Sequence, residues 1–391
     1  MRKLLRQSPP FLLGLAETGL VAIAVYFAAR WMIPPTAAPL SPAALIPALL
    51  AAALGVARGW SLPFARRRHP ARRALVLGTG RRAAELEALT SRRQSRTAIV
   101  GYVPFAGEPV EVPSARIAGD ADSLLAQARA ADVRENVVAL EDRRGMPLHS
   151  LLDARMEGVA VTSYLSFWER ETGRLNLDSL DLGWLIFSGG FRIVEATQQT
   201  LKRILDVAAS LALLVFTLPI LICAAIAIRL DSTGPVFYGQ QRVGRGGRVF
   251  TIHKFRTMRA DAEQGCGPRW AAHNDSRITR VGGFLRRTRI DELPQILNVL
   301  RGEMSFVGPR PERPHFVNLL TTEIPYFAER HRVRPGITGW AQINYPYGAS
   351  VADARAKLAY DLYYIKNFSI AFDLRIIART IRTVLFDRGA R

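Results

Sequence analysis

The sequence predicts a membrane-associated α/β protein, and three observations lead to that fold class. Long apolar segments occur near the N-terminus and again at residues 207–228. Between them, strand-like runs alternate with helical stretches, which is typical of a parallel α/β domain. The net charge of +20 over 391 residues indicates an anionic partner, and the apolar segments favour a lipid surface over nucleic acid. The two cysteines, Cys223 and Cys266, lie in an apolar run and a polar loop, which predicts a reducing compartment and no disulfide framework.

Residues 1–60 are predicted to form a transmembrane helical hairpin. The apolar run from Phe11 to about Ile33 is long enough to span a bilayer, and a second run follows the turn PPTAAPLSP, from Ala43 to Ala57. Basic residues precede the first run and follow the second, so the positive-inside rule places both ends of the hairpin in the cytoplasm. The lack of a small-residue cleavage pattern argues against a signal peptide. A buried soluble hairpin is the alternative.

Residues 72–165 are predicted to form a small Rossmann-like parallel α/β domain. In the run RRALVLGTGRRAAELEAL, Gly78, Gly80 and Ala83 match the G-x-G-x-x-A pattern of dinucleotide-binding turns. The next strand candidate, TAIVGYVP, ends without the acidic residue that would bind a ribose. A dinucleotide site and a purely structural turn both stay open. Residues 166–196 are expected to be a linker to a C-terminal domain over residues 197–391.

The apolar segment at 207–228 is predicted to enter the membrane and return to the same side. It contains no charged residue and is long enough to span, but Pro219 lies at its middle, where a helix loses a hydrogen bond and tends to kink. Basic residues flank both ends, and a spanning helix would leave one of these flanks outside. A re-entrant helix over residues 204–229 satisfies both flanks. The C-terminal domain is therefore expected on the cytoplasmic face of the membrane, and a spanning helix is the alternative.

An acidic pair in the C-terminal domain has cations around it. In VFTIHKFRTM, Lys254 and Arg256 are two residues apart on a strand-like run, so both are expected on one side of the strand, an arrangement that suits phosphate groups. In RTRIDELPQILNVL, the apolar spacing and the first-turn residue Pro294 predict a helix that begins near Asp291. At a helix N-terminus, the dipole and the neighbouring arginines favour the ionised forms of Asp291 and Glu292.

Two interpretations of this pair stay open. Asp291 is either a helix cap or a nucleophile that attacks phosphorus, with Glu292 holding the Mg²⁺ that shields a diphosphate. The following Gly-Pro-Arg-Pro turn holds Arg310 in a rigid loop, which adds a further cation.

Two basic stretches near the C-terminus have less specific patterns. The run YDLYYIKNFSIAFDLRIIARTIRTVLF combines aromatic and basic residues, so it is either a helix packed on its own domain or one in the lipid headgroup layer. The run RHRVRPGITGW suits either nucleotide phosphates or lipid headgroups.

Three stretches of the C-terminal domain resemble the bacterial sugar transferase family in order and spacing: KFRTM, DSRITRVGGFLRRTRIDELPQILNVLRGEMSFVGPRPE and RHRVRPGITGWAQINYPYG. These are polyprenyl-phosphate phosphoglycosyl transferases, and RIDELPQ and NYPYGAS are most similar to the exopolysaccharide branch associated with exosortase systems. The resemblance is close over residues 197–391 and looser before them. It implies a monotopic domain of the bacterial inner membrane that transfers a sugar 1-phosphate from a UDP-sugar to undecaprenyl phosphate and releases UMP. A homo-oligomer is left open.

The resemblance also implies roles for single residues. Asp291 matches the nucleophile that takes the phospho-sugar covalently, Glu292 matches the acidic partner associated with Mg²⁺, and Pro219 matches the break in the re-entrant helix. Four cations match phosphate-contacting or neighbouring positions of the family: Lys254, Arg256, Arg286 and Arg310. The alternative function is a catalytically inactive membrane scaffold or regulator of polysaccharide assembly. A DNA-binding regulator has no support, since the sequence shows no helix-turn-helix or zinc-ligand spacing.

Overall fold

The computed structural model describes residues 72–91, 95, 97–120, 123–180, 182–191, 196–259, 277–346, 348 and 350–386. The predicted hairpin at 1–60 lies outside these residues, and so does Cys266. The chain from Arg73 onward forms one compact unit.

A four-stranded sheet occupies the predicted Rossmann-like region. Its strands, in the order β2-β1-β3-β4, are β1 (Arg72–Leu77), β2 (Thr97–Val103), β3 (Glu135–Val138) and β4 (Ala160–Ser163). β1 pairs with β3 and β3 pairs with β4, both in parallel, with Val76 opposite Val137 and Val137 opposite Thr162. The prediction of a parallel α/β sheet is confirmed.

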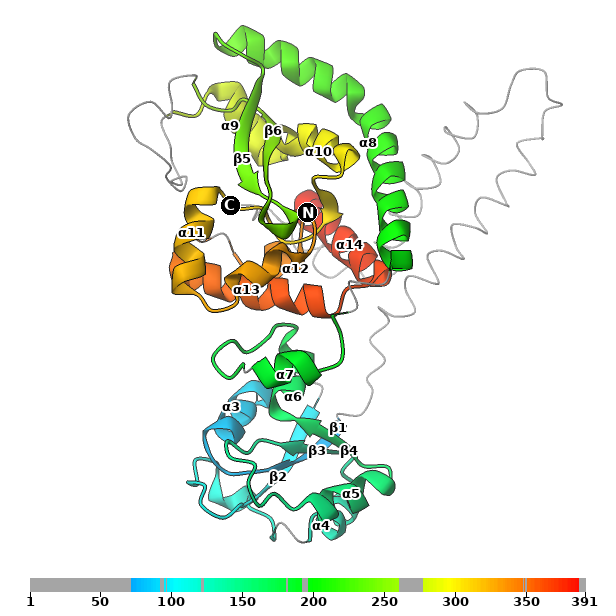
Figure 1. Cartoon of the computed structure of the whole chain (residues 1–391), viewed down its shortest axis with the longest axis vertical. Coiled ribbons are helices and arrows are strands. Elements are labelled where there is room, and N and C mark those ends of the chain that lie inside the picture. The colour runs from blue at the N-terminus through cyan, green and yellow to red at the C-terminus, as the bar shows by residue number, and fades with distance from the viewer. Residues whose placement is uncertain are drawn as a thin grey trace, which may run out of the picture. The chain divides into compact units, whose positions relative to one another are not determined.

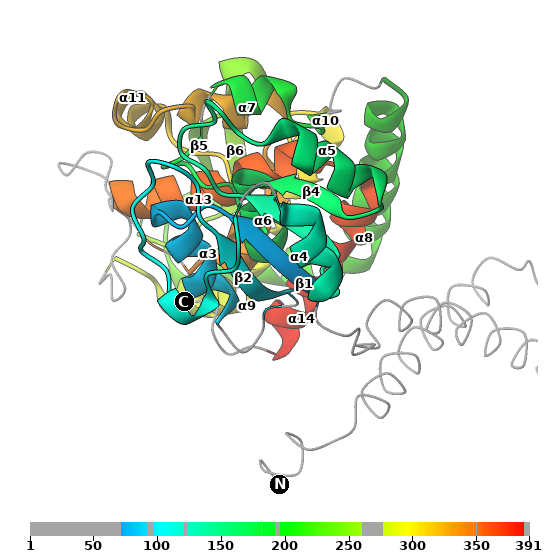
Figure 2. The same cartoon turned by 90° about the horizontal axis from the view of Figure 1, so that it is seen from below.

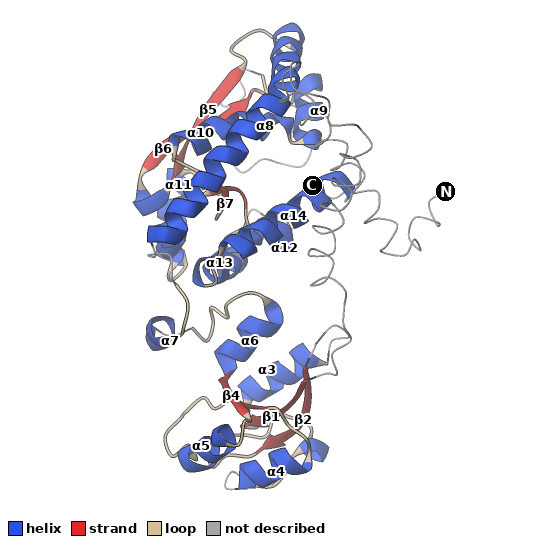
Figure 3. Cartoon of the chain, turned by 90° about the vertical axis from the view of Figure 1, so that its right-hand side faces the viewer, coloured by secondary structure: helices blue, strands red, loops and turns tan. Residues whose placement is uncertain are grey.

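Helices cover both faces of this sheet. They are α3 (Arg81–Thr90), α4 (Leu124–Ala130), α5 (Leu148–Met156) and α6 (Tyr164–Thr172), with the short turn η1 (Ser114–Arg116) after β2. Because side chains alternate along a strand, Ala74 and Val76 of β1 pack with α3 and α6, whereas Leu75 and Leu77 pack with α4 and α5. Figure 3 shows the sheet between these two pairs of helices, and Figure 2 views the same layers from below, from the side of α4 and α5.

The segment expected to be a linker is folded. Residues 166–196 hold most of α6 and the short helix α7 (Leu182–Phe187). On α6, the buried Glu169 accepts hydrogen bonds from Lys366 (2.5 Å) and Asn367 (2.7 Å). Just beyond α6, Gly173 O accepts a hydrogen bond from Trp340 Nε1 (2.7 Å). This segment therefore packs against the C-terminal helices instead of running freely between two domains.

The C-terminal domain consists of helices around two short sheets. After α8 (Ala196–Asp231) its elements are β5 (Phe237–Val243), η4 (Arg245–Gly247), β6 (Val249–Phe255), α9 (Arg280–Thr288), η5 (Ile290–Gln295), α10 (Ile296–Arg301), β7 (Ser305–Val307), α11 (Pro314–Glu323), η6 (Phe327–Arg332), β8 (Gly336–Thr338), α12 (Trp340–Asn344), α13 (Val351–Lys366) and α14 (Ile370–Phe386). β5 and β6 form an antiparallel hairpin, and β7 pairs with β8 in parallel. Tyr364, Phe368 and Phe372 are buried in the core, which supports the interpretation that the aromatic C-terminal run packs on its own domain.

α8 is the one helix in the described part of the chain that is long and apolar enough to cross a membrane. Pro219 lies inside it, and the helix continues on both sides, so the predicted break is a bend and not an interruption. Figure 1 shows α8 changing direction along its length. Large apolar side chains are exposed along the middle and the end of the helix: Leu211, Val215, Phe216, Leu218, Ile220, Ile222, Ile226 and Leu230.

Polar contacts fix the N-terminal part of α8 to the C-terminal domain. Arg203 donates hydrogen bonds to the carbonyl oxygens of Val299 (2.5 Å) and Leu300 (2.6 Å) at the end of α10. The buried Asp206 accepts a hydrogen bond from Ser305 Oγ (3.1 Å). Cations at a helix C-terminus and a hydrogen-bonded buried carboxylate both stabilise such an attachment.

The far end of α8 is attached to the same domain. Asp231 Oδ2 accepts a hydrogen bond from the backbone N–H of Val281 at the start of α9 (3.2 Å). Arg256, just after β6, donates to the carbonyl oxygens of Ser232 (2.7 Å) and Thr233 (2.9 Å). Both ends of this apolar helix therefore contact one globular domain.

A close backbone approach positions α9 against the end of β6. A Cβ atom on Gly282 would lie 2.1 Å from the carbonyl oxygen of Thr257, so only glycine allows this contact. The same carbonyl oxygen accepts the backbone N–H of Thr279 (3.1 Å), and the Thr257 hydroxyl accepts a hydrogen bond from Arg286 Nε (2.8 Å). Gly282 thus sets the position from which Arg286 reaches toward the acidic pair.

Candidate active site

The acidic pair lies on a tight turn between two helices. Asp291 and Glu292 belong to η5, a 3₁₀ turn, and the α-helix itself begins at Ile296. The predicted helix start near Asp291 is therefore correct in place but has 3₁₀ geometry. Arg289, between α9 and η5, has a φ of 60°, a left-handed conformation that is uncommon outside glycine. Such strain is often found at functional sites.

Asp291 does not cap a helix. Its side chain is 8% exposed, and its Oδ1 atom has no hydrogen-bond partner among the residues that the structure describes. The N-cap positions of η5 and α10 are Arg289 and Gln295, so Asp291 occupies neither of them. A buried oxygen without a donor is costly, because it loses its hydration without compensation. The geometry therefore disfavours the cap interpretation and leaves an acceptor oxygen available for other chemistry.

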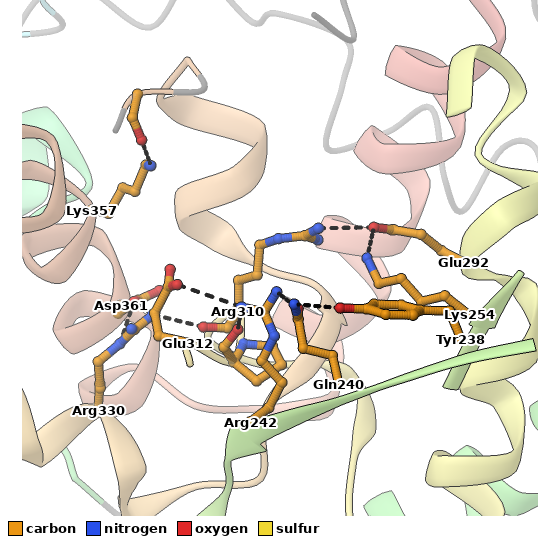
Figure 4. A network of polar contacts seen from close by, with 12 residues as sticks. Tyr238, Gln240, Arg242, Lys254, Glu292, Arg310, Glu312, Arg330, Lys357 and Asp361 are labelled. Carbon is orange, nitrogen blue, oxygen red and sulfur yellow. Dashed lines mark hydrogen bonds and ion pairs between the residues drawn. The ribbon is translucent and has the colours of Figure 1, made fainter. Parts of the chain in front are cut away.

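Two cations from distant segments hold Glu292. Lys254 Nζ on β6 lies 2.9 Å from Glu292 Oε1, and Arg310 Nη2 lies 2.8 Å from the same oxygen. Figure 4 shows both side chains converging on the carboxylate. These three residues were all predicted as site residues, and the structure brings them together.

The surroundings of the two carboxyl groups shift their pKa values in opposite directions. Burial alone would raise the pKa of Glu292, but the Arg310 guanidinium and the Lys254 ammonium hold that pKa well below its usual range. Burial raises the pKa of Asp291, the Glu292 charge raises it further, and the cations Lys254, Arg286 and Arg289 oppose the rise. The sequence argument that helix dipole and arginines dominate at Asp291 is therefore reversed by burial. Glu292 is therefore held as an anion, whereas the Asp291 carboxylate, with its raised pKa, binds a proton more readily than a free aspartate does.

The loop that carries Arg310 is held by a buried ion pair. Arg330 Nη2 donates to the carbonyl oxygen of Arg310 (2.9 Å) and to Asp361 Oδ2 (2.8 Å), and Arg330 Nε donates to the same Asp361 oxygen (3.1 Å). Figure 4 shows this pair to the left of Arg310, on the side away from Glu292. Gly336 N–H adds a hydrogen bond to Pro309 O (2.9 Å).

Sequence reasoning missed this support. The RHRVRPG run was expected to face phosphates or headgroups, but its Arg330 is buried against Asp361. Nothing in the sequence around Asp361 distinguishes it from an exposed helical carboxylate.

The other two predicted cations have different surroundings. Arg286 donates to Thr257, and its charge acts on Asp291, so it lies beside the pair. Arg256 is buried and donates to carbonyl oxygens at the end of α8, as described above. Lys254 and Arg256 do not converge on one partner: the Arg256 N–H still pairs with Val236 O (2.9 Å), but its guanidinium donates to Ser232 and not to the acidic pair. Arg256 holds α8, while Lys254 holds Glu292.

The glycine-rich turn after β1 binds a carboxylate of the chain itself, that of Glu108. The Thr79 N–H donates to Glu108 Oε2 (3.1 Å), and the Glu141 N–H donates to Glu108 Oε1 (3.2 Å). Gly78 has a φ of +116°, and a Cβ there would lie 2.9 Å from Glu108 Oε2. A carboxylate of the chain thus uses an N–H of the turn, which favours the structural interpretation of this motif over a pyrophosphate site.

The acidic pair fits a magnesium ion only in part. Among the described residues, no group of three or more His, Cys, Asp or Glu side chains is placed to hold a metal. Mg²⁺ commonly binds one or two carboxylates and completes its coordination with water and substrate phosphates. The unpartnered Asp291 Oδ1 suits such a ligand, whereas Glu292 Oε1 already accepts from two cations.

Comparison with known proteins agrees with the motifs of this site. A family model described as bacterial sugar transferase matches residues 197–387. The exopolysaccharide production protein PSS of Rhizobium leguminosarum bv. phaseoli is 45% identical over 189 residues, which cover 46% of this chain and 93% of that protein. The chain belongs to the bacterial sugar transferase family.

Other members of the bacterial sugar transferase family are longer than the matched region. The UDP-N-acetylgalactosamine-undecaprenyl-phosphate N-acetylgalactosaminephosphotransferase of Aeromonas hydrophila is 41% identical over 261 residues, 67% of this chain and 59% of that protein. The undecaprenyl-phosphate glucose phosphotransferase of Komagataeibacter xylinus is 46% identical over 194 residues, 48% of this chain and 36% of that protein. The chain therefore matches between about one third and three fifths of the length of these two relatives.

Proposed function

We propose that this protein is an undecaprenyl-phosphate sugar phosphotransferase. It takes a sugar 1-phosphate from a UDP-sugar, passes it to undecaprenyl phosphate, and so begins an exopolysaccharide or O-antigen-type glycan. The observation that carries the proposal is the buried Asp291 oxygen without a hydrogen-bond donor in the described structure, next to a Glu292 fixed by Lys254 and Arg310. The names of the relatives contain undecaprenyl phosphate with different sugars, so the donor sugar stays open.

The proposed reaction has two displacements at phosphorus. A carboxylate oxygen of Asp291 attacks the phosphorus that carries the sugar, the bond from that phosphorus to the bridging oxygen breaks, and UMP leaves with the electron pair. A phosphate oxygen of undecaprenyl phosphate then attacks the aspartyl phospho-sugar. The bond to Asp291 breaks, undecaprenyl-diphosphate-sugar forms, and the carboxylate is restored.

The surrounding residues supply charge and position. Lys254, Arg286 and Arg310 place positive charge beside the pair, where a diphosphate would otherwise repel the nucleophile. Glu292 keeps Lys254 and Arg310 in place through its two ion pairs. Burial removes water from Asp291, which leaves its ionised oxygen less solvated and more reactive.

We also propose that the protein binds Mg²⁺ as a cofactor. Asp291, and Glu292 through the carboxylate oxygen that is not paired with Lys254 and Arg310, would hold it together with the donor phosphates, and it would neutralise charge on the diphosphate.

The membrane arrangement is also proposed. Both ends of α8 contact one globular domain, and that domain cannot lie on both sides of a bilayer, so α8 enters and leaves on the same side. The bend of the helix and its exposed apolar middle fit insertion of the bent part into the lipid. With the positive-inside rule, that side is the cytoplasmic face of the inner membrane.

Replacing Asp291 with Asn tests the nucleophile. The exchange removes the attacking anion, so UMP release is expected to fall by about 10³ or more. Folding stability is expected to stay the same or rise slightly, because a buried charge beside Glu292 disappears. UMP release across UDP-sugars and thermal unfolding are the two measurements. Near-normal turnover by Asp291→Asn would refute the covalent mechanism and favour a scaffold.

A buried aspartate elsewhere in the domain serves as the matched control. Asp361→Asn leaves Arg330 without its partner and is expected to cost about 3–5 kcal/mol of stability. Asp291→Asn should thus lose turnover without losing stability, whereas Asp361→Asn should lose stability and, through the Arg310 loop that Arg330 holds, part of its turnover.

Removal of divalent metal tests the cofactor. In the same UMP-release assay, excess chelator is expected to stop turnover, and added Mg²⁺ is expected to restore it, because the diphosphate charge is otherwise not neutralised. Undiminished turnover in chelator would contradict a role for the metal.

Labelling from outside the cell tests the topology. In a background with Cys223 and Cys266 changed to serine, single cysteines replace the exposed Thr197, in the first turn of α8, and the exposed Thr233, just after the helix ends. Neither is expected to react with a membrane-impermeant maleimide in intact cells, and both should react after permeabilisation. A reaction at one flank alone in intact cells would show a spanning helix.

A further inference from the structure

A large pocket lies at the carboxyl ends of β3 and β4, away from the acidic pair. Its volume of about 1080 Å³ is sufficient for a nucleotide. Arg143, beyond the end of β3, and Ser163, the last residue of β4, line it together with Tyr363 and Lys366 of α13. Ligands of parallel α/β sheets bind at this edge of the sheet. The pocket is separate from the glycine-rich turn after β1, because no residue of that turn lines it.

Two arginines of this pocket have no anionic partner. Of the four cations that line it, two are paired with buried carboxylates: Arg170 with Glu135 (2.6 Å) and Lys366 with Glu169 (2.5 Å). The other two, Arg143 and Arg155, are exposed and form no ion pair with any residue that the structure describes. Their charge is therefore not neutralised within the chain, and guanidinium groups bind phosphate through paired hydrogen bonds.

A serine hydroxyl adds a neutral donor to the same pocket. Ser163 caps α6, where its Oγ accepts the N–H of Ser166 (3.4 Å) and donates to Ser166 Oγ (3.0 Å). The Ser166 hydroxyl lines the pocket and donates to none of the described residues. Its hydrogen is therefore available to an oxygen of a bound anion.

Aromatic rings of α7 line another part of the pocket. Phe187 is 88% exposed, so its ring is open to a ligand. Trp184, one turn earlier, has Lys366 Nζ 3.9 Å from the centre of its ring, which ties α7 to α13. An exposed ring stacks on a nucleic-acid base of any kind, because every base has a π-face. The pocket thus combines cations that suit phosphate with a ring that suits a base.

We propose that this pocket binds a nucleoside diphosphate, with its phosphates on Arg143 and Arg155 and its base against Phe187. The two unpaired arginines match two phosphate groups, and the volume is far larger than an inorganic phosphate fills. The inference goes beyond the proposed function and does not depend on it, since neither Asp291 nor Glu292 lines the pocket.

Calorimetry with ADP tests the phosphate contacts. ADP is the probe because the proposed donor is a uridine nucleotide, so ADP reports on this pocket and not on the acidic pair. The full chain in lipid nanodiscs is expected to bind ADP. Arg143→Glu is expected to weaken that binding by about tenfold or more, because repulsion replaces a charge-assisted contact.

The next residue supplies the matched control. Arg144 is also exposed, but it pairs with Asp142 (2.6 Å) and does not line the pocket. Arg144→Glu makes the same change of net charge and should leave the ADP affinity unchanged. ADP that does not bind the unchanged protein, or an affinity that is the same in both variants, would overturn the proposal.

A second pair of variants tests the base contact. Phe187→Ala is expected to weaken ADP binding by about tenfold, the loss of one stacking contact, and to leave the affinity for inorganic pyrophosphate unchanged. Ile186→Ala changes an exposed neighbour that does not line the pocket and should keep both affinities. An ADP affinity that Phe187→Ala leaves unchanged, or pyrophosphate that binds as tightly as ADP, would overturn the assignment to a nucleotide.

These measurements need no turnover, so they separate this site from the proposed function. Absence of UMP release with every UDP-sugar would overturn the proposed function alone. Calorimetry with ADP would still decide whether the pocket binds a nucleotide.

Discussion

Two adjacent carboxylates, the buried Asp291 and the largely buried Glu292, lie on one turn, and their mutual repulsion and lost hydration must be offset by charge from elsewhere in the fold. Glu292 meets this demand through Lys254 from the β5–β6 hairpin and Arg310 from the loop after β7. That loop depends in turn on Arg330 and Asp361, which are buried behind it. Because these cations pair with Glu292, Asp291 is the carboxylate of the pair whose Oδ1 has no hydrogen-bond donor among the described residues. The ion pairs that connect the parts of the domain around Glu292 therefore also leave Asp291 available to react.

The apolar helix and the acidic pair are parts of one assembly. α8 is attached at both ends to the domain that carries the pair, through Arg203 at one end and through Asp231 and Arg256 at the other. α9 lies between α8 and the pair, and Gly282 sets its distance from the end of β6. A reaction that moves a sugar phosphate from a water-soluble nucleotide sugar to a lipid needs this adjacency, because both substrates must reach the same carboxylate.

The sequence predicted those features that depend on local pattern or on charge. The parallel sheet follows from alternating strand and helix signals, and Lys254, Arg310 and Glu292 meet as expected. The sequence did not predict the features that depend on tertiary packing. The Arg256 side chain binds the end of α8 and not the acidic pair, and Pro219 bends α8 without ending it. Burial, which no residue pattern near Asp291 reports, outweighed the arginines in setting its pKa. The Arg330–Asp361 pair spans 31 residues and has no local signal at all.

The central claim is that Asp291 carries the phospho-sugar between donor and acceptor. The most direct measurement is mass spectrometry of the protein after incubation with a UDP-sugar, without undecaprenyl phosphate, followed by acid quenching and trypsin. Cleavage after Arg289 and Arg301 yields the peptide Ile290–Arg301, which contains Asp291. The account predicts that this peptide gains the mass of the sugar phosphate and loses it when undecaprenyl phosphate is added. An unmodified peptide, with UMP formed only once the acceptor is present, would contradict it.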